Sequence, residues 1–116
     1  MHELGLMETA LQTALSEACR VGAERIDRLT LRVGAAAGAD SDVLRMGFAA
    51  MTRGTIAAGA QLEIEMIPVR VCCPNCQFEF EPEYADEIYF ECPHCHSFTT
   101  SVIQGKDIGL GQVEVE

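Results

Sequence analysis

The amino-acid sequence predicts an α+β fold: two helices packed on one face of a three-stranded mixed sheet, with an inserted zinc-ribbon module. Three observations predict this fold. Two segments carry apolar residues at three- and four-residue spacing, three segments alternate apolar and polar residues, and two Cys-x-x-Cys pairs lie before the last of these. These are the periods of amphipathic helices and half-buried strands. A chain of 116 residues, 48% hydrophobic, suits one modest core that a metal would help to stabilise.

Residues 3–20 are predicted to form the first helix, which Gly22 ends. Its apolar stripe consists of Leu4, Met7, Leu11, Ala14, Leu15 and Ala18. Residues 25–34 are predicted to form the first strand. Along it the apolar Leu29, Leu31 and Val33 alternate with the polar Arg28, Thr30 and Arg32. One face of this strand is therefore expected to be buried (its dry face), and the other to be exposed to solvent (its wet face).

A second amphipathic helix is predicted to start at Ser41, as the N-cap, and to end near Ala58-Gly59. Its apolar stripe is Val43, Leu44, Gly47, Phe48, Met51 and Thr55. The second strand places Leu62, Ile64 and Met66 on its dry face, and the third contains Ile108, Leu110, Val113 and Val115. A single wet sheet face implies that both helices cover the other face. We expect residues 1–70 plus 105–116 to form an αβ domain and residues 71–104 to form a separate module that carries the two cysteine pairs.

The net charge of the chain argues against one class of function, nucleic-acid binding. The net charge is −10, and the eight Lys and Arg residues are scattered. Nucleic-acid binding depends on clustered cations, so we expect no nucleic-acid partner, although an acidic surface can also serve solubility alone. No apolar run reaches the roughly 18 residues of a membrane span, and no signal peptide opens the chain. Paired cysteines favour a metal over disulfides, so a reducing, cytoplasmic location is expected.

The strongest pattern for a binding site is a pair of Cys-Pro-x-Cys turns. They read Cys73-Pro74-Asn75-Cys76 and Cys92-Pro93-His94-Cys95, with fifteen residues between the inner cysteines. A tetrahedral zinc ion takes four soft ligands, and each turn supplies two thiolates on one side of the ion. The separation matches the zinc-ribbon pattern. The sequence therefore predicts a structural zinc site at Cys73, Cys76, Cys92 and Cys95, with short hairpin strands between the pairs.

Other uses of the cysteines stay open at this point. A redox Cys-x-x-Cys usually follows a strand and opens a helix, and an iron–sulfur site wants a different spacing, although iron can occupy four thiolates. Cys72 can substitute for Cys73 as a ligand. His94 and His96 can replace a thiolate, bind a second metal, or stay exposed and inert. Cys19, beside the stripe of the first helix, is expected to be a buried thiol.

The chain begins Met1-His2-Glu3. A free α-amine, an imidazole and ionised backbone amides can chelate a metal in a square plane, which suits Ni(II) and Cu(II). A bulky second residue should leave Met1 in place, so the amine would be that of Met1. A histidine at position 2 can equally be an accident of sequence or the remnant of a tag.

The combination of features resembles the HypA/HybF family of nickel-incorporation proteins for hydrogenase maturation. The resemblance covers essentially the whole chain. It is carried by the Met1-His2-Glu3 start, Val33-Gly34 at the end of the first strand, Gly54-Thr55, Ala58-Gly59-Ala60, the two Cys-Pro-x-Cys pairs followed by Ser97, and Gly105-Lys106-Asp107-Ile108. The Met-His-Glu start and the paired cysteine module are its most specific parts.

The resemblance implies a metallochaperone rather than an enzyme. His2 would be the principal nickel ligand, joined by the Met1 amine, the backbone amides of His2 and Glu3, and the Glu3 side chain. The four cysteines would hold zinc. The expected partners are an accessory nickel-insertion GTPase and the hydrogenase large subunit, and in some organisms urease maturation factors. Neither nucleic acid nor membrane is an expected partner, and we expect a monomer or a weak dimer.

Some residues depart from the family pattern. Ala35, Ala36 and Ala37 stand where the family often has Glu, Leu and Ser, and His96 stands where it often has Gly. Asp40 and Asp42 can reach a metal or serve in helix capping. No nucleophile–base pair and no Gly-rich phosphate loop points to an enzyme. Two other functions remain: a zinc-ribbon adaptor that binds proteins without delivering nickel, and a thiol redox switch.

Overall fold

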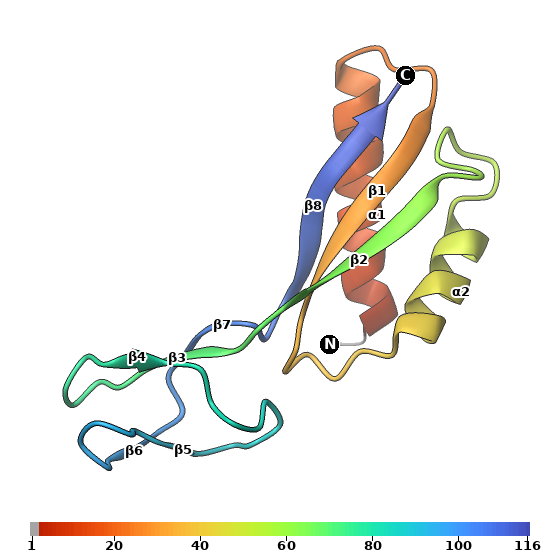
Figure 1. The fold of residues 1–116 in the computed structure, drawn as a ribbon. Coiled ribbons are helices and arrows are strands. Elements are labelled where there is room, and N and C mark those ends of the chain that lie inside the picture. Colours follow the sequence, from red (N-terminus) through yellow and green to blue (C-terminus); the bar gives the residue numbers. More distant parts are fainter. Residues whose placement is uncertain (1–2) are drawn as a thin grey trace. The chain divides into compact units, whose positions relative to one another are not determined.

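The computed structural model describes residues 3–116, and its elements follow the predicted order (Figure 1). The helices are α1 (Glu3–Arg20) and α2 (Ser41–Met51), and the long strands are β1 (Ile26–Gly34), β2 (Gln61–Ile67) and β8 (Ile108–Val115). Short strands lie between β2 and β8: β3 (Arg70–Cys72), β4 (Glu79–Phe80), β5 (Phe90–Glu91), β6 (Phe98–Thr99) and β7 (Val102–Gln104). The predicted α+β class with an inserted cysteine module is confirmed. Neither helix of the described residues is long and apolar enough to cross a membrane.

The contacts divide the chain into two compact units. The first unit comprises the chain up to Arg32 together with Ala39–Glu65 and Ile108–Glu116, and the second unit comprises Val33–Gly38 together with Met66–Asp107. The chain therefore passes between the units four times. The division into a nickel-binding domain and a zinc-binding module, with the boundaries given above, stays a prediction.

The three long strands form one sheet in the order β2-β1-β8. β1 and β8 are antiparallel, because the backbone N–H of Glu24 donates to the carbonyl of Glu116 (2.8 Å) and that of Gly34 donates to Asp107 (2.8 Å). The residue numbers thus rise along one strand and fall along the other.

β2 lies on the other side of β1 and runs parallel to it. The Arg28 side chain donates to Gln61 near the start of both strands (3.2 Å), and the Ala35 N–H donates to the Ile67 carbonyl near their ends (2.8 Å). The sheet is therefore mixed. A parallel pair needs a crossover between its strands, and α2 supplies it.

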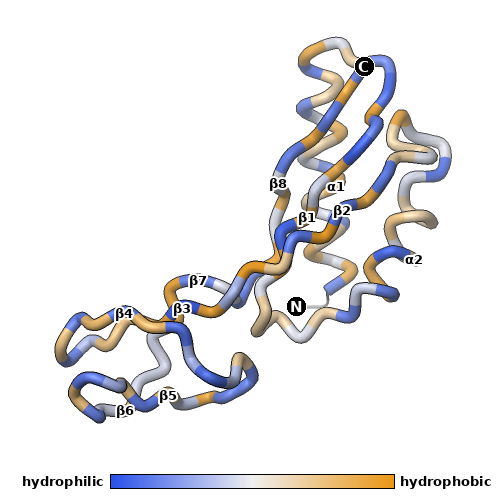
Figure 2. Tube along the Cα trace, in the orientation of Figure 1, coloured by the Kyte–Doolittle hydropathy of each residue, from blue (hydrophilic) through white to orange (hydrophobic). Residues whose placement is uncertain are grey.

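One face of the sheet is buried, as the alternation predicted. Leu29, Leu31 and Val33 of β1 are at most 1% exposed, whereas Arg28 and Arg32 are exposed. Figure 2 shows the same alternation of hydrophilic and hydrophobic residues along the strands. Because α1 packs against both β8 and α2, the two helices share the buried face.

α1 has its predicted bounds. Much of its predicted stripe is buried, whereas Leu4 and Leu15 are only partly buried. The buried residues of α1 are Met7, Ala10, Leu11, Ala14 and Ala18. Gly47 lets α2 approach this stripe closely. A Cβ added at Gly47 would lie 2.5 Å from Leu4 Cδ2 and 3.0 Å from Met7 Cε. The helix–helix contact therefore occupies the space that any larger residue would need at position 47.

The predicted start of α2 was wrong by one residue. Asp40 is the N-cap, because its Oδ1 accepts hydrogen bonds from the backbone N–H groups of Asp42 (2.8 Å) and Val43 (3.4 Å), and Ser41 is the first helical residue. A carboxylate here satisfies N–H groups that lack partners in the helix and lies at the positive end of its dipole.

α2 also ends at Met51 instead of near Ala58-Gly59. Both the backbone N–H and the hydroxyl of Thr52 donate to the Phe48 carbonyl, at 3.0 and 2.9 Å, and Gly54 then adopts a left-handed φ of 74°. The Thr52 N–H thus makes the last helical hydrogen bond, and the left-handed Gly54 prevents the helix from continuing, although the apolar spacing of the sequence goes on.

The predicted dry face of β2 was wrong at its end. Leu62 is buried, but Met66 is 57% exposed. The chain leaves the first unit after Glu65, so the core of that unit does not cover Met66.

In the second unit, Gly34 and Gly105 lie against each other. A Cβ added at Gly34 would lie 2.3 Å from the backbone carbonyl carbon and oxygen of Gly105. Gly105 has a φ of 96°, and a Cβ there would lie 2.6 Å from the Pro68 carbonyl oxygen. Three passages of the chain meet at this point, and neither glycine has room for a side chain.

The loop after Gly34 packs on the apolar cluster of the second unit. Val69, Val71, Cys73, Phe80, Phe90 and Cys92 form that cluster. Ala36 packs against it, and the Ala36 N–H donates to the Gly105 carbonyl (2.8 Å). The run of alanines therefore belongs to the second unit, where a small residue fits the space.

Gly34→Ala should lower the free energy of unfolding by about 1–3 kcal/mol, because a Cβ overlaps backbone atoms that cannot rotate away. Urea unfolding followed by circular dichroism measures this change. Gly109→Ala is the matched control, because a Cβ added at Gly109 meets nothing within 4 Å. Equal urea midpoints for the two variants would show that the contact between Gly34 and Gly105 can accommodate a methyl group.

Candidate metal centre

Each cysteine pair lies in the turn of its own β-hairpin. β3 pairs with β4 across the first pair, and β5 pairs with β6 across the second. The prediction of strands between the pairs was correct in position, but those strands do not pair with each other. Since the two hairpins enclose the two turns, each turn is held from both sides by its own strands.

The two turns use the same backbone hydrogen bonds. In the first, the Cys73 N–H donates to Phe78 (3.0 Å) and the Gln77 N–H donates back to Cys73 (2.6 Å). In the second, Cys92 donates to Ser97 and His96 donates to Cys92, both at 2.8 Å. The proline after the first cysteine of each turn fixes its own φ and needs no donor.

The residue after each second cysteine adopts a left-handed conformation. The φ angle is 65° at Gln77 and 64° at His96. Glycine adopts this conformation at least cost, so both Gln77 and His96 bear backbone strain.

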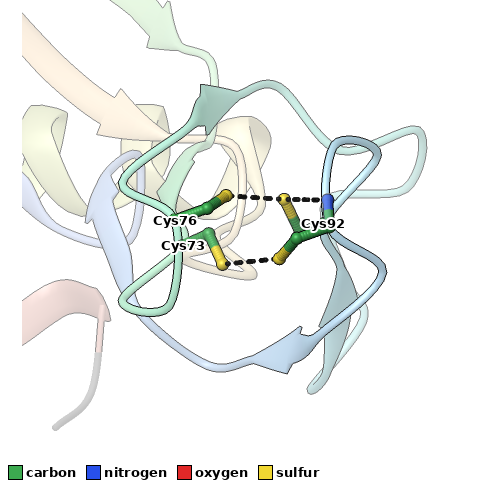
Figure 3. Close-up of side chains that lie close together, drawn as sticks. Cys73, Cys76 and Cys92 are labelled. Carbon is green, nitrogen blue, oxygen red and sulfur yellow. Dashed lines mark hydrogen bonds between the residues drawn. The ribbon is translucent and has the colours of Figure 1, made fainter.

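The four thiols converge (Figure 3). The sulfurs of Cys73, Cys76, Cys92 and Cys95 all lie within 4.8 Å of one another. Two pairs that join the turns, Cys73–Cys95 and Cys76–Cys92, are each separated by 3.6 Å. A tetrahedral zinc with Zn–S bonds of about 2.3 Å separates its sulfurs by about 3.8 Å. The cluster therefore has the donor type, number and size of a zinc site, and its sulfurs are too far apart for a disulfide.

Two of the four ligand candidates are buried and two are partly exposed. Cys73 and Cys92, the first cysteine of each turn, are buried at 0% exposure, while Cys76 and Cys95 are half-buried. An ion here would be enclosed on the side of the apolar cluster and accessible on the other.

The electrostatics of the metal-free cluster distinguish the two half-buried thiols. Hydrogen bonds from the Asn75 side chain and from the side chain and backbone of Ser97 lower the pKa of Cys95 to about 5. At Cys76 a backbone hydrogen bond from Phe78 acts in the same direction. Burial and hydrogen bonds with the other three thiols outweigh it and raise the pKa of Cys76 to about 12. Crowded thiols cannot all ionise without a cation, so the cluster retains protons that a metal would displace.

Cys72, His94 and His96 lie outside this cluster. Among residues 3–116 the metal-binding group contains Cys73 and not Cys72. The His94 ring stacks on Phe78 with centroids 5.5 Å apart, and His96 Nδ1 lies 3.6 Å from a Glu91 carboxylate oxygen. The four sulfurs are therefore sufficient for a closed tetrahedral site.

The expectation that Cys19 is buried was wrong, because this thiol is exposed. The buried stripe of α1 runs through Ala18, and the next residue along a helix points to a different face.

The predicted nickel ligands lie at the start of the chain. Met1 and His2 are outside the described residues, so their part of the prediction is untested. Glu3 is the first residue of α1, and its Oε2 accepts a hydrogen bond from the Asp40 N–H (2.9 Å). Asp40 itself caps α2, and Asp42 lies in the first helical turn.

Sequence reasoning did not identify Asn75 and Ser97 as members of the site. Asn75 Nδ2 donates to Cys95 Sγ at 3.5 Å and to Ser97 Oγ at 3.2 Å. The residue between two cysteines carries no metal-binding signal of its own. Only the repetition of the turn could have pointed to Asn75, because Asn75 and His94 occupy the same position in the two turns.

Comparison with known proteins places the chain in a family. A family model described as hydrogenase/urease nickel incorporation, metallochaperone, HypA, matches residues 1–115. The "Hydrogenase maturation factor HypA" of Picosynechococcus sp. is 36% identical over 115 residues, which cover 99% of each chain. The protein of the same name from Chloroflexus aggregans is 38% identical over 114 residues, 98% of each chain.

A solved structure has the same fold. The solution structure of the Ni metallochaperone HypA from Helicobacter pylori matches with a TM-score of 0.76 at 23% identity, covering 99% of this chain and 97% of that one. The structural likeness shows the fold, and the full-length match to the family model shows the ancestry. The chain therefore belongs to the HypA family of hydrogenase/urease nickel-incorporation metallochaperones.

Proposed function

We propose that this chain is a nickel metallochaperone, which binds Ni(II) at its N-terminus and assists nickel insertion into the hydrogenase large subunit, and which holds a structural zinc at Cys73, Cys76, Cys92 and Cys95. The match of the family model to residues 1–115 carries this proposal, since it includes both the start of the chain and the cysteine module.

The geometry of the four thiols supports the zinc part. The cluster offers soft donors at tetrahedral spacing and leaves no position for a substrate, which is typical of structural sites. The ion would replace the protons of the crowded thiols and join the two hairpins. The zinc therefore holds the second unit together and takes no part in a reaction.

The chemistry of the first residues supports the nickel part. The Met1 amine, the His2 imidazole and two ionised backbone amides would supply four nitrogen donors, a set that suits square-planar Ni(II). The Glu3 N–H is available because the first four N–H groups of a helix have no partner within the helix. An ionised amide is also favoured at the positive end of the helix dipole.

Glu3 has a second use that limits how its side chain takes part. Its carboxylate is already engaged with the Asp40 N–H, next to the start of α2. In this proposal Glu3 contributes its backbone nitrogen to the nickel site, and its carboxylate holds the cap of α2.

The partners follow from the delivery of nickel. They are an accessory GTPase and the hydrogenase large subunit, with urease maturation factors as further candidates. The protein acts in the cytoplasm, as a carrier and not as an enzyme. Since Ni(II) is the cargo, its site has to release the ion to a stronger binder, and a site on a few terminal residues permits this.

A zinc-ribbon adaptor without nickel delivery is the second candidate function. Exposed apolar side chains of the second unit favour it: Tyr84, Ile88, Tyr89 and Phe98 are 57, 76, 66 and 70% exposed. Such residues are typical of contact surfaces. An adaptor needs no metal at the N-terminus, so nickel binding separates the two functions.

His2→Ala should abolish the binding of about one equivalent of Ni(II), because it removes the imidazole donor. Titration calorimetry of the zinc-loaded protein measures this, and zinc content and thermal unfolding should be unchanged. Glu3→Gln is the matched control. Its amide oxygen can still accept from Asp40, so nickel binding should persist. Undiminished nickel affinity in His2→Ala would contradict the proposal.

Cys73→Ser should eliminate the tetrahedral thiolate spectrum that Co(II) produces in place of zinc, since three thiolates no longer close the site. Cys72→Ser, one residue away, should leave that spectrum unchanged. Absorption during Co(II) titration under reducing conditions compares the two variants. If Cys72→Ser lost the spectrum and Cys73→Ser kept it, the ligand set would have to be reassigned.

A further inference from the structure

The two cysteine turns contact each other in matched pairs. The third residue of each turn is Asn75 in the first and His94 in the second. The residue two places after each second cysteine is Phe78 in the first and Ser97 in the second. Asn75 Nδ2 donates to Ser97 Oγ at 3.2 Å, and the His94 ring stacks on the Phe78 ring at 5.5 Å and 17°. The third residue of each turn therefore contacts the residue two places after the second cysteine of the other turn. One of these two contacts is polar and the other is aromatic.

Of these two contacts between the turns, only the polar one brings a hydrogen-bond donor to a cysteine sulfur. Asn75 Nδ2 also donates to Cys95 Sγ at 3.5 Å. Ser97 Oγ accepts from the same amide nitrogen, so Ser97 holds Asn75 in the position from which it reaches Cys95. The two contacts of Asn75 therefore join the first turn to Ser97 and Cys95 of the second.

Cys76 occupies the equivalent position in the first turn, but its surroundings differ. The residue of the first turn that is equivalent to Ser97 is Phe78, whose ring has no polar hydrogen for the Cys76 sulfur. Cys76 and Cys95 are both half-buried, so a reagent has comparable access to each. The two thiolates therefore differ in hydrogen bonding rather than in exposure.

We infer that Asn75 and Ser97 are positioning residues that make the metal site asymmetric: they stabilise and deactivate the Cys95 thiolate, and leave Cys76 as the ligand at which attack and metal exchange begin. A hydrogen bond to a thiolate stabilises its charge and lowers its nucleophilicity. Groups that hydrogen-bond to metal ligands also orient them and retain the metal. The inference rests on the zinc site proposed above.

The test is the position of the first label on the zinc-loaded protein. Substoichiometric N-ethylmaleimide adds one thiolate across its double bond, with a proton taken from water, and mass spectrometry of the singly labelled protein locates the label. The label should lie mainly on Cys76. In Asn75→Ala the share on Cys95 should rise about tenfold relative to Cys76, as expected for the loss of hydrogen bonds to a charged sulfur.

Two further variants separate this effect from a general loosening of the site. His94→Ala removes the aromatic contact at the equivalent position and should leave the distribution between Cys76 and Cys95 unchanged. Ser97→Ala should shift labelling toward Cys95, and Ser97→Thr, which keeps the hydroxyl, should restore the original distribution. The Ser97 pair also tests the inference independently of whether Asn75→Ala folds.

The outcomes distinguish this inference from the zinc proposal. Slow labelling shared equally by Cys76 and Cys95 in the unaltered protein would overturn the asymmetry while the zinc site stands. An unchanged distribution in both Asn75→Ala and Ser97→Ala would do the same. A protein that holds no zinc, whose four thiols all react as free thiols, would overturn the zinc site and this inference together.

Discussion

The contact between Gly34 and Gly105 is the constraint on which the rest of the chain path depends. Three backbone passages meet there: the end of β1, the link from β2 to β3 and the link from β7 to β8. Hydrogen bonds from Gly34 to Asp107, from Ala35 to Ile67 and from Ala36 to Gly105 hold them together. Because β2 and β8 both flank β1, this meeting point sets the register of a parallel and an antiparallel pair at once. A close-packed backbone crossing cannot absorb even one methyl group without shifting strands.

Much of the fold could be predicted because its periodicity is local. The stripe of α1 and the alternation of β1 depend on nearby residues, so both elements appear within about a residue of their predicted bounds. The end of α2 could not be predicted from spacing, since the apolar pattern continues past Met51 while the backbone turns left-handed at Gly54. The cap was misplaced because Asp40 and Ser41 are both good caps, and only the backbone geometry decides between them.

The convergence of the four cysteines was predictable from the sequence, and the surroundings of this candidate metal centre were not. Two Cys-x-x-Cys pairs can be arranged around a tetrahedral ion in few ways, because all four thiolates have to lie close to that ion. The contacts of Asn75 with Cys95 and Ser97 depend on how the two turns face each other. That information lies in tertiary structure, and a single sequence reveals it only through the repeat of positions in the two turns.

The insertion of the cysteine module between β2 and β8 has a consequence for the order in which the chain folds. β8 is synthesised after β1 and β2, yet it pairs with β1, so the sheet is completed only after residues 68–107 have emerged. While those residues are unfolded, β8 is tethered to β2 by a long flexible loop whose closure costs entropy. A metal that ties the two hairpins together shortens the effective loop and raises the local concentration of β8 near β1. Capture of one ion within the second unit would then speed the completion of the sheet in the first.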